Sequence, residues 1–323
     1  MTPRLLITLG DVAGIGPEIV ARAWPQLVTF SRPVVVGNPD WVEFGIRLVG
    51  SSATVASANA APSESVIPCQ AATKVSLADV QPGQVSATAG QAAYDFLITA
   101  IDLTLKGEAD AIVTCPLHKE GLHAAGVKHP GHTEILAERT GTKEFAMVLW
   151  GDGIAVAHVT LHIALRDVFA GLTTPAVLEK IRLLNGLLPK LLGRKPRIGV
   201  AALNPHASDG GLFGDEEARI IAPAVAAGQA DGIDVSGPWP ADTLFVRADK
   251  GAFDGIVAMY HDEGHIAMKL RCGPRCVNIT VGLPIVRTSV AHGTAYDIAG
   301  KGVADAGSLV TAADVASRIA AAS

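Results

Sequence analysis

The sequence predicts an α/β fold with a doubly wound, mainly parallel sheet. Short apolar runs rich in β-branched residues alternate along the chain with longer Ala- and Leu-rich stretches of helical periodicity. Such alternation favours parallel strands, because each helix carries the chain back across the sheet. Of the 323 residues, 49% are hydrophobic, so the chain can bury a large core in one large domain or two interdigitated ones.

The individual elements follow from the length and bounds of each run. Strands are expected at LLITLG 5–10, PVVVG 33–37, AIVTC 111–115, IAVAHVTLH 154–162, RIGVAAL 197–203, GIVAMY 255–260 and VNITVG 277–282. Helices are expected over GPEIVARAWPQL, GQAAYDFLITAIDLTLKG, PAVLEKIRLLNGLLPKLL and DEEARIIAPAVAAGQA. Residues 51–66 are rich in Ser and Ala and are expected to form a surface loop with little structure.

Charge and hydropathy limit the classes of partner. The formal net charge is -5 and no basic run occurs, so neither nucleic acid nor an anionic membrane is an expected partner. The first apolar run is broken by Gly and Asp too early for a signal peptide, and no run of 18 apolar residues follows. The four cysteines show no disulfide spacing, and the CGPRC segment lacks a second pair, which favours a turn over a metal clip. We therefore expect a cytoplasmic protein that acts on a small soluble molecule.

Chemically capable side chains follow five of the expected strands. In open α/β sheets ligands bind beyond the carboxyl ends of the strands, so this edge is the expected active site. The groups are Asp11; His118 and Lys119; Arg166 and Asp167; Asn204 and His206; and His261, Asp262 and His265.

Three histidines near such strand ends form a candidate metal site. Neutral imidazoles from His162, His206 and His261, with a fourth position open, suit Zn²⁺ or a similar divalent ion. Their spacing matches no local metal motif, and histidines that are only hydrogen-bonded or exposed are the alternative. Asp242 and Asp262 are candidates to orient the imidazoles or to act as a base.

Anion-binding groups are also present in the C-terminal third. Lys269, Asn278 and Arg287 supply charge and directional donors within apolar segments, although solvated surface residues are an equal alternative. The segment GDVAGIGPEIV lacks the GxGxxG spacing, so it is either a phosphate-binding turn or a tight strand-to-helix turn with Pro17 in the first helical turn. In AHGTAYDIAGKGVAD at 291–305, His292 and Asp297 are candidates to bind an adenosine moiety.

Nine segments along nearly the whole chain carry a family resemblance. They are GDVAGIGPE, PLHKEGLHAAG, PGHTE, LHIALRD, LNPHASDGGLFG, GPWPADTLF, MYHDEGHIAMK, VNITVGLPIVRTS and HGTAYDIAG. Together they resemble the 4-hydroxythreonine-4-phosphate dehydrogenase (PdxA) family. The first and last are also similar to stretches of isopropylmalate and isocitrate dehydrogenases, which bind NAD(P) without a Rossmann loop. The resemblance implies that fold, with the active site in a cleft between a cofactor-side subdomain at 1–134 plus 279–323 and a metal, substrate and dimerisation subdomain at 135–278.

The resemblance also implies roles for individual residues. The family's metal ligands fall on His162, His206 and His261, and its substrate-binding positions on His132, Thr133, Lys269, Asn278 and Arg287. Gly293, Thr294 and Asp297 are the expected cofactor-binding residues, and Asp242, Asp262 or Lys119 the expected proton carriers. The implied enzyme is a homodimer with a shared active site, using NAD or NADP and one divalent metal, with Zn preferred and Mg, Mn and Co left open.

The implied reaction is oxidation and decarboxylation of a small phosphorylated hydroxy acid. A bound metal lowers the pKa of the substrate hydroxyl, the nicotinamide accepts hydride, and the β-keto acid loses CO₂. The expected substrate is 4-phosphohydroxy-L-threonine, as in vitamin B6 biosynthesis. Glu263 and His265 depart from the HDQG pattern of the biosynthetic enzymes and resemble the branch that oxidises 4-phospho-D-threonate or 4-phospho-D-erythronate.

Two remoter functions stay open at this stage. One is an aromatic cis-dihydrodiol dehydrogenase of the terephthalate type, against which the retained PGHTE segment argues. The other is a non-redox acyl-phosphate transferase or phosphometabolite-binding protein, against which the three histidines and HGTAYDIAG argue.

Overall fold

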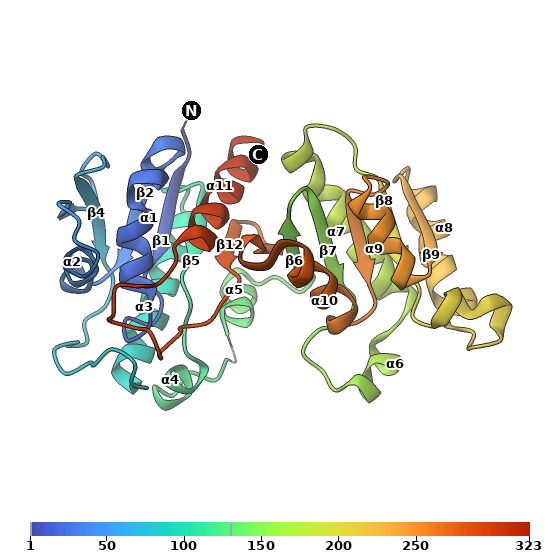
Figure 1. Cartoon of the computed structure of the whole chain (residues 1–323), viewed down its shortest axis with the longest axis horizontal. Coiled ribbons are helices and arrows are strands. Elements are labelled where there is room, and N and C mark those ends of the chain that lie inside the picture. Colours follow the sequence, from blue (N-terminus) through green and yellow to red (C-terminus); the bar gives the residue numbers. More distant parts are fainter. Residues whose placement is uncertain (1, 130) are drawn as a thin grey trace. The chain divides into compact units, whose positions relative to one another are not determined.

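The structure is a computed structural model that describes residues 2–129 and 131–323. The chain divides into two compact units, Met1–Lys143 with Leu283–Ser323 (unit 1) and Glu144–Gly282 (unit 2). The sequence-based boundaries lay at 134/135 and 278/279. Both units are α/β structures with mostly parallel strands, which confirms the predicted fold class (Figure 1).

Unit 1 contains a parallel sheet. Its strands lie in the order β3-β4-β2-β1-β5-β12, and each neighbouring pair is parallel. Their bounds are β1 Arg4–Thr8, β2 Arg32–Gly37, β3 Thr54–Ser57, β4 Val66–Ala71, β5 Ala111–Thr114 and β12 Val286–Val290. The expected loop at 51–66 is therefore wrong in part, because β3 lies within it. Short strands at a sheet edge need only partial burial, so β3 lacks the apolar signal of a central strand.

Two groups of helices pack in unit 1. The first group is α1 Gly16–Phe30, α2 Pro39–Leu48 and α11 Gly307–Ala321, and the second is α3 Ala87–Leu105, α4 Lys119–Ala124 and α5 His132–Thr140. Local signals start several of them. Pro17 occupies the first turn of α1, and the side chains of Asn38 and Ser86 accept hydrogen bonds from backbone N–H groups at the starts of α2 and α3.

Unit 2 contains a mixed sheet in the order β11-β6-β7-β10-β8-β9. The bounds are β6 Ala146–Gly151, β7 Ile154–His158, β8 Ile198–Ala201, β9 Val235–Trp239, β10 Gly255–Ala258 and β11 Val277–Val281. β7, β10, β8 and β9 are parallel, whereas β6 is antiparallel to both β7 and β11. The carboxyl ends of β7, β10 and β8 therefore meet at one edge.

The helices of unit 2 pack against different strands of this sheet. α7 Thr174–Leu192 and α8 Ala222–Ala230 pack together, and α7 lies on β7, β10 and β8. α10 His261–Cys272 lies on β6, β7 and β10, and α9 Ala241–Asp249 lies beside β8. Short irregular helices complete the unit: η1 Leu165–Asp167, α6 Val168–Gly171, η2 Pro205–Gly211, the π-helical turn η3 Glu217–Ile221 and η4 Gly273–Arg275.

All four cysteines are free and buried, and the CGPRC segment forms the turn η4, as expected. Within residues 2–129 and 131–323, no helix combines the length and apolar character needed to cross a bilayer.

Candidate active site

The candidate site begins at the strand edge of unit 2. His162 lies in the loop after β7, His206 in the η2 loop after β8, and His261 at the first position of α10 after β10. The strand expected over 154–162 ends at His158, four residues before His162. Beyond that point the backbone N–H groups of Val159 and Thr160 still bond to the end of β10, at Ala258 and Met259, and the chain then bends away.

The structure brings two of the three predicted metal ligands together. The ring centroids of His162 and His261 are 5.7 Å apart, and Nδ1 of His261 lies 2.7 Å from Oδ1 of Asp262. His206 is exposed on its own loop, with its ring 6.4 Å from that of Phe213. Over the described part of the chain, no group of three or more His, Cys, Asp or Glu side chains is arranged to hold a metal ion.

Two further histidines extend the pair. The His265 ring stacks on His261 at a centroid distance of 3.7 Å, and its Nδ1 lies 3.2 Å from Nε2 of the buried His158. Burial and the neighbouring imidazoles lower the pKa of His158 to about 3 and that of His265 to about 4, so both are neutral at pH 7. His158 was not among the predicted residues, because the strand was expected to continue to residue 162 and His158 lay inside it.

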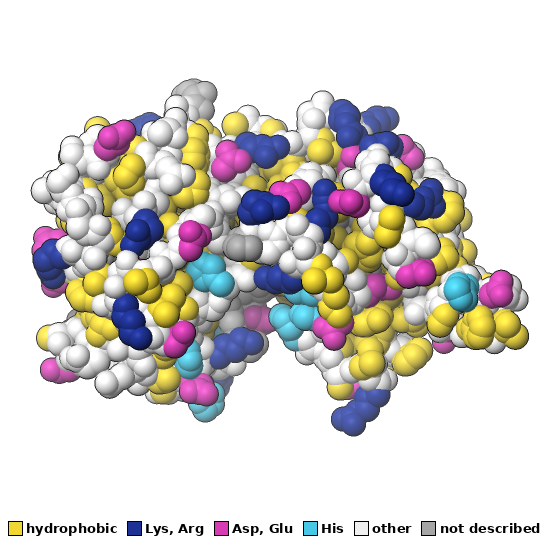
Figure 2. All heavy atoms as spheres, viewed as in Figure 1, with side chains coloured by type: hydrophobic (Ala, Val, Ile, Leu, Met, Phe, Trp, Pro, Cys, Tyr) yellow, Lys and Arg dark blue, Asp and Glu magenta, His cyan; other side chains and the backbone are white. Residues whose placement is uncertain are grey.

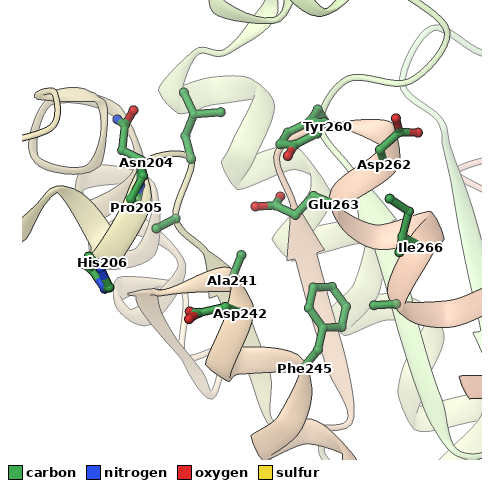
Figure 3. A pocket seen from close by; sticks show the side chains of 13 residues that line it. Asn204, Pro205, His206, Ala241, Asp242, Phe245, Tyr260, Asp262, Glu263 and Ile266 are labelled. Atoms are coloured by element: carbon green, nitrogen blue, oxygen red, sulfur yellow. The ribbon is translucent and has the colours of Figure 1, made fainter. Parts of the chain in front are cut away.

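A pocket of about 640 Å³ with three carboxyl side chains in its lining lies in unit 2 (Figure 3). Asn204, Pro205 and His206 line one side, Tyr260, Asp262, Glu263 and Ile266 the other, and Asp242 and Phe245 of α9 lie between them. This arrangement gathers the predicted residues His206, Asp242 and Asp262. The third predicted proton carrier, Lys119, is exposed at the start of α4 in unit 1.

Glu263 is the most perturbed acid of this pocket. Its side chain points into the pocket, and its carboxylate accepts a hydrogen bond from Met259 N at 2.5 Å (Figure 3). Burial raises the pKa of Glu263 to about 8, so the side chain is largely protonated at pH 7. A neutral acid presents the same pairing of one donor and one acceptor as the Gln of the HDQG pattern.

The predicted anion-binding residues divide between the units. In unit 1, Arg287 of β12 is buried and donates from Nη2 to Oγ1 of Thr114 at 2.7 Å. Burial lowers the pKa of Arg287 to about 10, and burial together with the charge of Arg287 lowers the pKa of His132 at the start of α5. Thr133 follows on the same turn. In unit 2, Lys269 is exposed on α10, and Asn278 of β11 has a buried Oδ1 that finds no hydrogen-bond partner among the described residues.

The predicted cofactor loop packs on the first glycine-rich turn within unit 1. Ile15 N donates to Thr294 O at 3.0 Å, and a Cβ on Gly14 would approach Thr294 O to 2.8 Å, so only glycine fits there. Gly293 and Asp297 are exposed on the same loop.

A buried acid ties this loop to its neighbours. The hydroxyl of Tyr296 donates to the carboxylate of Asp11 at 2.6 Å, and the Tyr296 ring stacks on His118 at 4.6 Å. The contribution of Tyr296 was missed, because a tyrosine in a glycine-rich loop shows no partner in the sequence.

Comparisons with known proteins support the family resemblance. The family model described as "Pyridoxal phosphate biosynthetic protein PdxA" matches residues 29–316. The chain is 48% identical to a 4-hydroxythreonine-4-phosphate dehydrogenase of Beijerinckia indica, over 98% of this chain and 94% of that protein. It is 44% identical to a D-threonate 4-phosphate dehydrogenase of Bordetella bronchiseptica, over 98% and 93% of the two chains.

A solved structure supports the same assignment. The crystal structure of 4-hydroxythreonine-4-phosphate dehydrogenase from Klebsiella pneumoniae has a TM-score of 0.89 and 42% identity, covering 99% of this chain and 98% of that one. Sequence and structure thus agree over nearly the full length, and the chain belongs to the PdxA family.

Proposed function

We propose that this protein is an NAD(P)-dependent dehydrogenase that oxidises and decarboxylates a 4-phosphorylated hydroxy acid, 4-phosphohydroxy-L-threonine. The observation that carries the proposal is full-length similarity to dehydrogenases of that name, together with imidazoles and carboxylates at one strand edge of unit 2. The four buried, free cysteines suit a reducing cytoplasm, where we place the enzyme.

The proposed divalent metal is held by His162, His206 and His261. Three imidazoles with nearby carboxylates are a donor set that suits Zn²⁺, with Mg²⁺, Mn²⁺ and Co²⁺ as alternatives. The neutral state of the neighbouring His158 and His265 fits such a site, because protonated neighbours would repel a cation. Since His162 and His261 lie together and His206 lies apart, we propose that two copies of the chain each contribute ligands to one metal.

Exposed apolar side chains support a homodimer. Unit 2 carries them beside the proposed ligands: Leu165 and Phe169 follow His162, Leu212 follows His206, and Ile266 and Leu270 follow His261 on α10. Ile163 and Phe213 lie beside them and are exposed as well. The exposed fractions of these seven side chains are 46–84%, far above what large apolar side chains normally show. Figure 2 shows hydrophobic side chains gathered over unit 2. An apolar patch next to an incomplete site favours a second copy of this chain as its cover.

Other residues are proposed to transfer protons and to bind the substrate. When bound, the metal would lower the pKa of the substrate hydroxyl and stabilise negative charge on oxygen. Asp242, Asp262 and Lys119 are the candidates to accept and return protons. Arg287, His132 and Thr133 in unit 1, and Lys269 and Asn278 in unit 2, are proposed to bind the anionic groups of the substrate.

The loop with Gly293, Thr294 and Asp297 is proposed to hold the nucleotide. The Thr294 carbonyl of this loop accepts from Ile15 N and the Tyr296 hydroxyl donates to Asp11, contacts that would keep the binding surface preorganised. Neither NAD nor NADP is favoured by the residues present.

A second substrate is favoured by two residues of α10. Glu263 and His265 resemble the sugar-acid branch, and a D-threonate 4-phosphate dehydrogenase is among the similar proteins. The alternative is therefore oxidation of 4-phospho-D-threonate or 4-phospho-D-erythronate by the same chemistry.

Kinetics with the three phosphorylated acids test both proposals. Reduced nicotinamide would be followed by absorbance with NAD and with NADP, before and after chelation and after metal is restored. The largest kcat/KM is expected for 4-phosphohydroxy-L-threonine, whereas a higher value for either sugar acid would establish the alternative. If no substrate gives a signal with metal restored, the dehydrogenase proposal is wrong.

A further inference from the structure

We infer that Glu217 is a positioning residue that fixes the loop presenting His206, and thereby sets the affinity of the proposed metal site. This inference rests on the proposed role of His206 as a metal ligand. All the residues involved lie in unit 2.

The backbone around His206 has an unusual conformation. His206, Ala207, Ser208 and Asp209 have φ angles of 55°, 54°, 69° and 46°, followed by Gly210 at 71°. Non-glycine residues rarely adopt this left-handed region, and successive ones are rarer still, because Cβ crowds the following carbonyl oxygen. A run of this kind persists only where surrounding contacts determine it.

Glu217 supplies those contacts. The side chain is buried, and Oε1 accepts hydrogen bonds from the backbone N–H groups of Leu203 at 2.8 Å and Asn204 at 2.7 Å. Oε2 accepts from Nδ2 of Asn204 at 2.9 Å and from the hydroxyl of Ser208. The carboxylate therefore ties residues 203–204 to residue 208, and His206 lies in the segment between them.

The charge state of Glu217 suits this role. Burial alone would raise its pKa, but the hydrogen bonds from Asn204 and Ser208 outweigh burial and lower it below the ordinary value. The ionised carboxylate accepts all four bonds, since it has only acceptors. A glutamine would turn an amide N–H₂ group toward two of these donors.

The chain offers a matched control at the preceding position. Glu216 is partly exposed and reaches the same loop through one hydrogen bond, which its Oε2 accepts from Nδ2 of Asn204 at 2.7 Å. It bonds to no backbone group of the loop, so its removal should leave the left-handed run in place.

Titration with Co²⁺, followed by its visible absorption, tests the inference in the full-length protein. We expect Glu217→Gln to weaken Co²⁺ binding by about 10- to 100-fold and to alter the absorption bands, because the ligand geometry changes. Glu216→Gln should bind Co²⁺ like the wild type, and His206→Ala should lose the high-affinity site. If Glu217 only stabilised the fold, Glu217→Gln would lower the thermal stability without changing the spectrum of bound Co²⁺.

The outcomes separate this inference from the proposed function. If His206→Ala loses Co²⁺ but Glu217→Gln binds it with wild-type affinity and spectrum, the positioning role is wrong and the metal site stands. If His206→Ala binds Co²⁺ normally, both the metal role of His206 and the inference are wrong. Should Glu217→Gln fail to fold, Ser208→Ala removes only one of the four bonds. We then expect about three- to tenfold weaker binding, and unchanged binding would overturn the inference.

Discussion

At the scale of single residues, the environment of each acid decides its chemistry. Glu263 and Asp242 line the same pocket, yet Glu263 is half-buried with a pKa raised to about 8, whereas Asp242 is exposed at the start of α9. A base must be ionised to accept a proton, and Glu263 is largely protonated at pH 7, so Asp242 is the better candidate of the two. Glu263 is better suited to donate a hydrogen bond.

We expect Asp242→Asn to lower kcat by about 10²–10⁴-fold, because the amide cannot accept the proton. The free energy of unfolding should change by less than about 0.5 kcal/mol, since the side chain is exposed. Steady-state kinetics and urea unfolding check the two parts. Asp249→Asn, at the other end of the same helix, is the control and should keep wild-type kcat. A wild-type kcat in Asp242→Asn would leave Asp262 and Lys119 as the candidate bases.

Arg287 is expected to act through binding of the substrate anion. In Arg287→Lys the planar fork becomes a point charge, and we expect KM for the phosphorylated substrate to rise about tenfold with little change in kcat. Arg275→Lys serves as the control, because Arg275 is largely exposed and pairs with Asp152 on the surface. If kcat falls while KM is unchanged, Arg287 acts in the transition state instead.

At the scale of elements, one carboxylate holds the starts of two strands of unit 2. Asp254 precedes β10 and is buried, and it accepts hydrogen bonds from the guanidinium groups of Arg194 and Arg197 and from Arg197 N, just before β8. Burial alone would raise the pKa of Asp254, but these bonds outweigh burial and hold it well below its ordinary value.

The stability that Asp254 contributes should depend on pH. A carboxyl whose pKa is depressed in the folded state stabilises the fold above its unfolded pKa, and this stability is lost as the pH falls toward the folded pKa. We expect Asp254→Asn to lower the free energy of unfolding at pH 7 by about 2 kcal/mol, a value discounted because both arginines are half exposed. The difference in free energy of unfolding between the wild type and Asp254→Asn, the stability gap, should narrow by roughly 1 kcal/mol as the pH falls from 5 to 3.

Urea unfolding at pH 7, 5 and 3 measures this gap. Asp215→Asn is the control, because Asp215 forms an exposed pair with Arg219 and should have little effect at any of these pH values. A gap that is constant from pH 7 to pH 3 would show that the pKa of Asp254 is not depressed.

The elements also show how far the sequence could predict this molecule. Several strands and long helices were predictable because their periodicity is local, as at 111–115 and 175–192. Strands β3, β4, β6, β9 and β12 were not predicted. β3 is half-buried and carries a weak apolar signal, whereas the antiparallel direction of β6 is set by distant partners. Within the site, strand-end placement pointed to His162, His206 and His261. It could not show that His206 lies apart, nor that Glu217, in a stretch expected to be an ordinary helix, binds that loop.

At the scale of the whole molecule, the metal site requires more than one chain in our proposal. The described residues of one chain bring His162 and His261 to a centroid distance of 5.7 Å but form no three-ligand group. In a dimer with two-fold symmetry, each copy would give His206 to one site and His261 to the other. A variant that lacks one histidine then damages both sites of its homodimer.

Mixing two inactive variants tests this arrangement. His206→Ala and His261→Ala should each be inactive alone, since every site lacks one ligand. After the two proteins are unfolded together and refolded, half of the dimers carry one of each chain. One site of such a dimer lacks both ligands and the other is intact, so about one quarter of wild-type activity should return.

The recovery distinguishes the shared site from its alternative. If a single chain supplied all three ligands, every site in the mixture would still lack one histidine and no activity would return. As a control, His206→Ala refolded with itself should stay inactive, which excludes recovery caused by the procedure. Substituting Leu270 by Glu in both chains should abolish the recovery, because a charge on this exposed apolar position of α10 would oppose the contact between the copies.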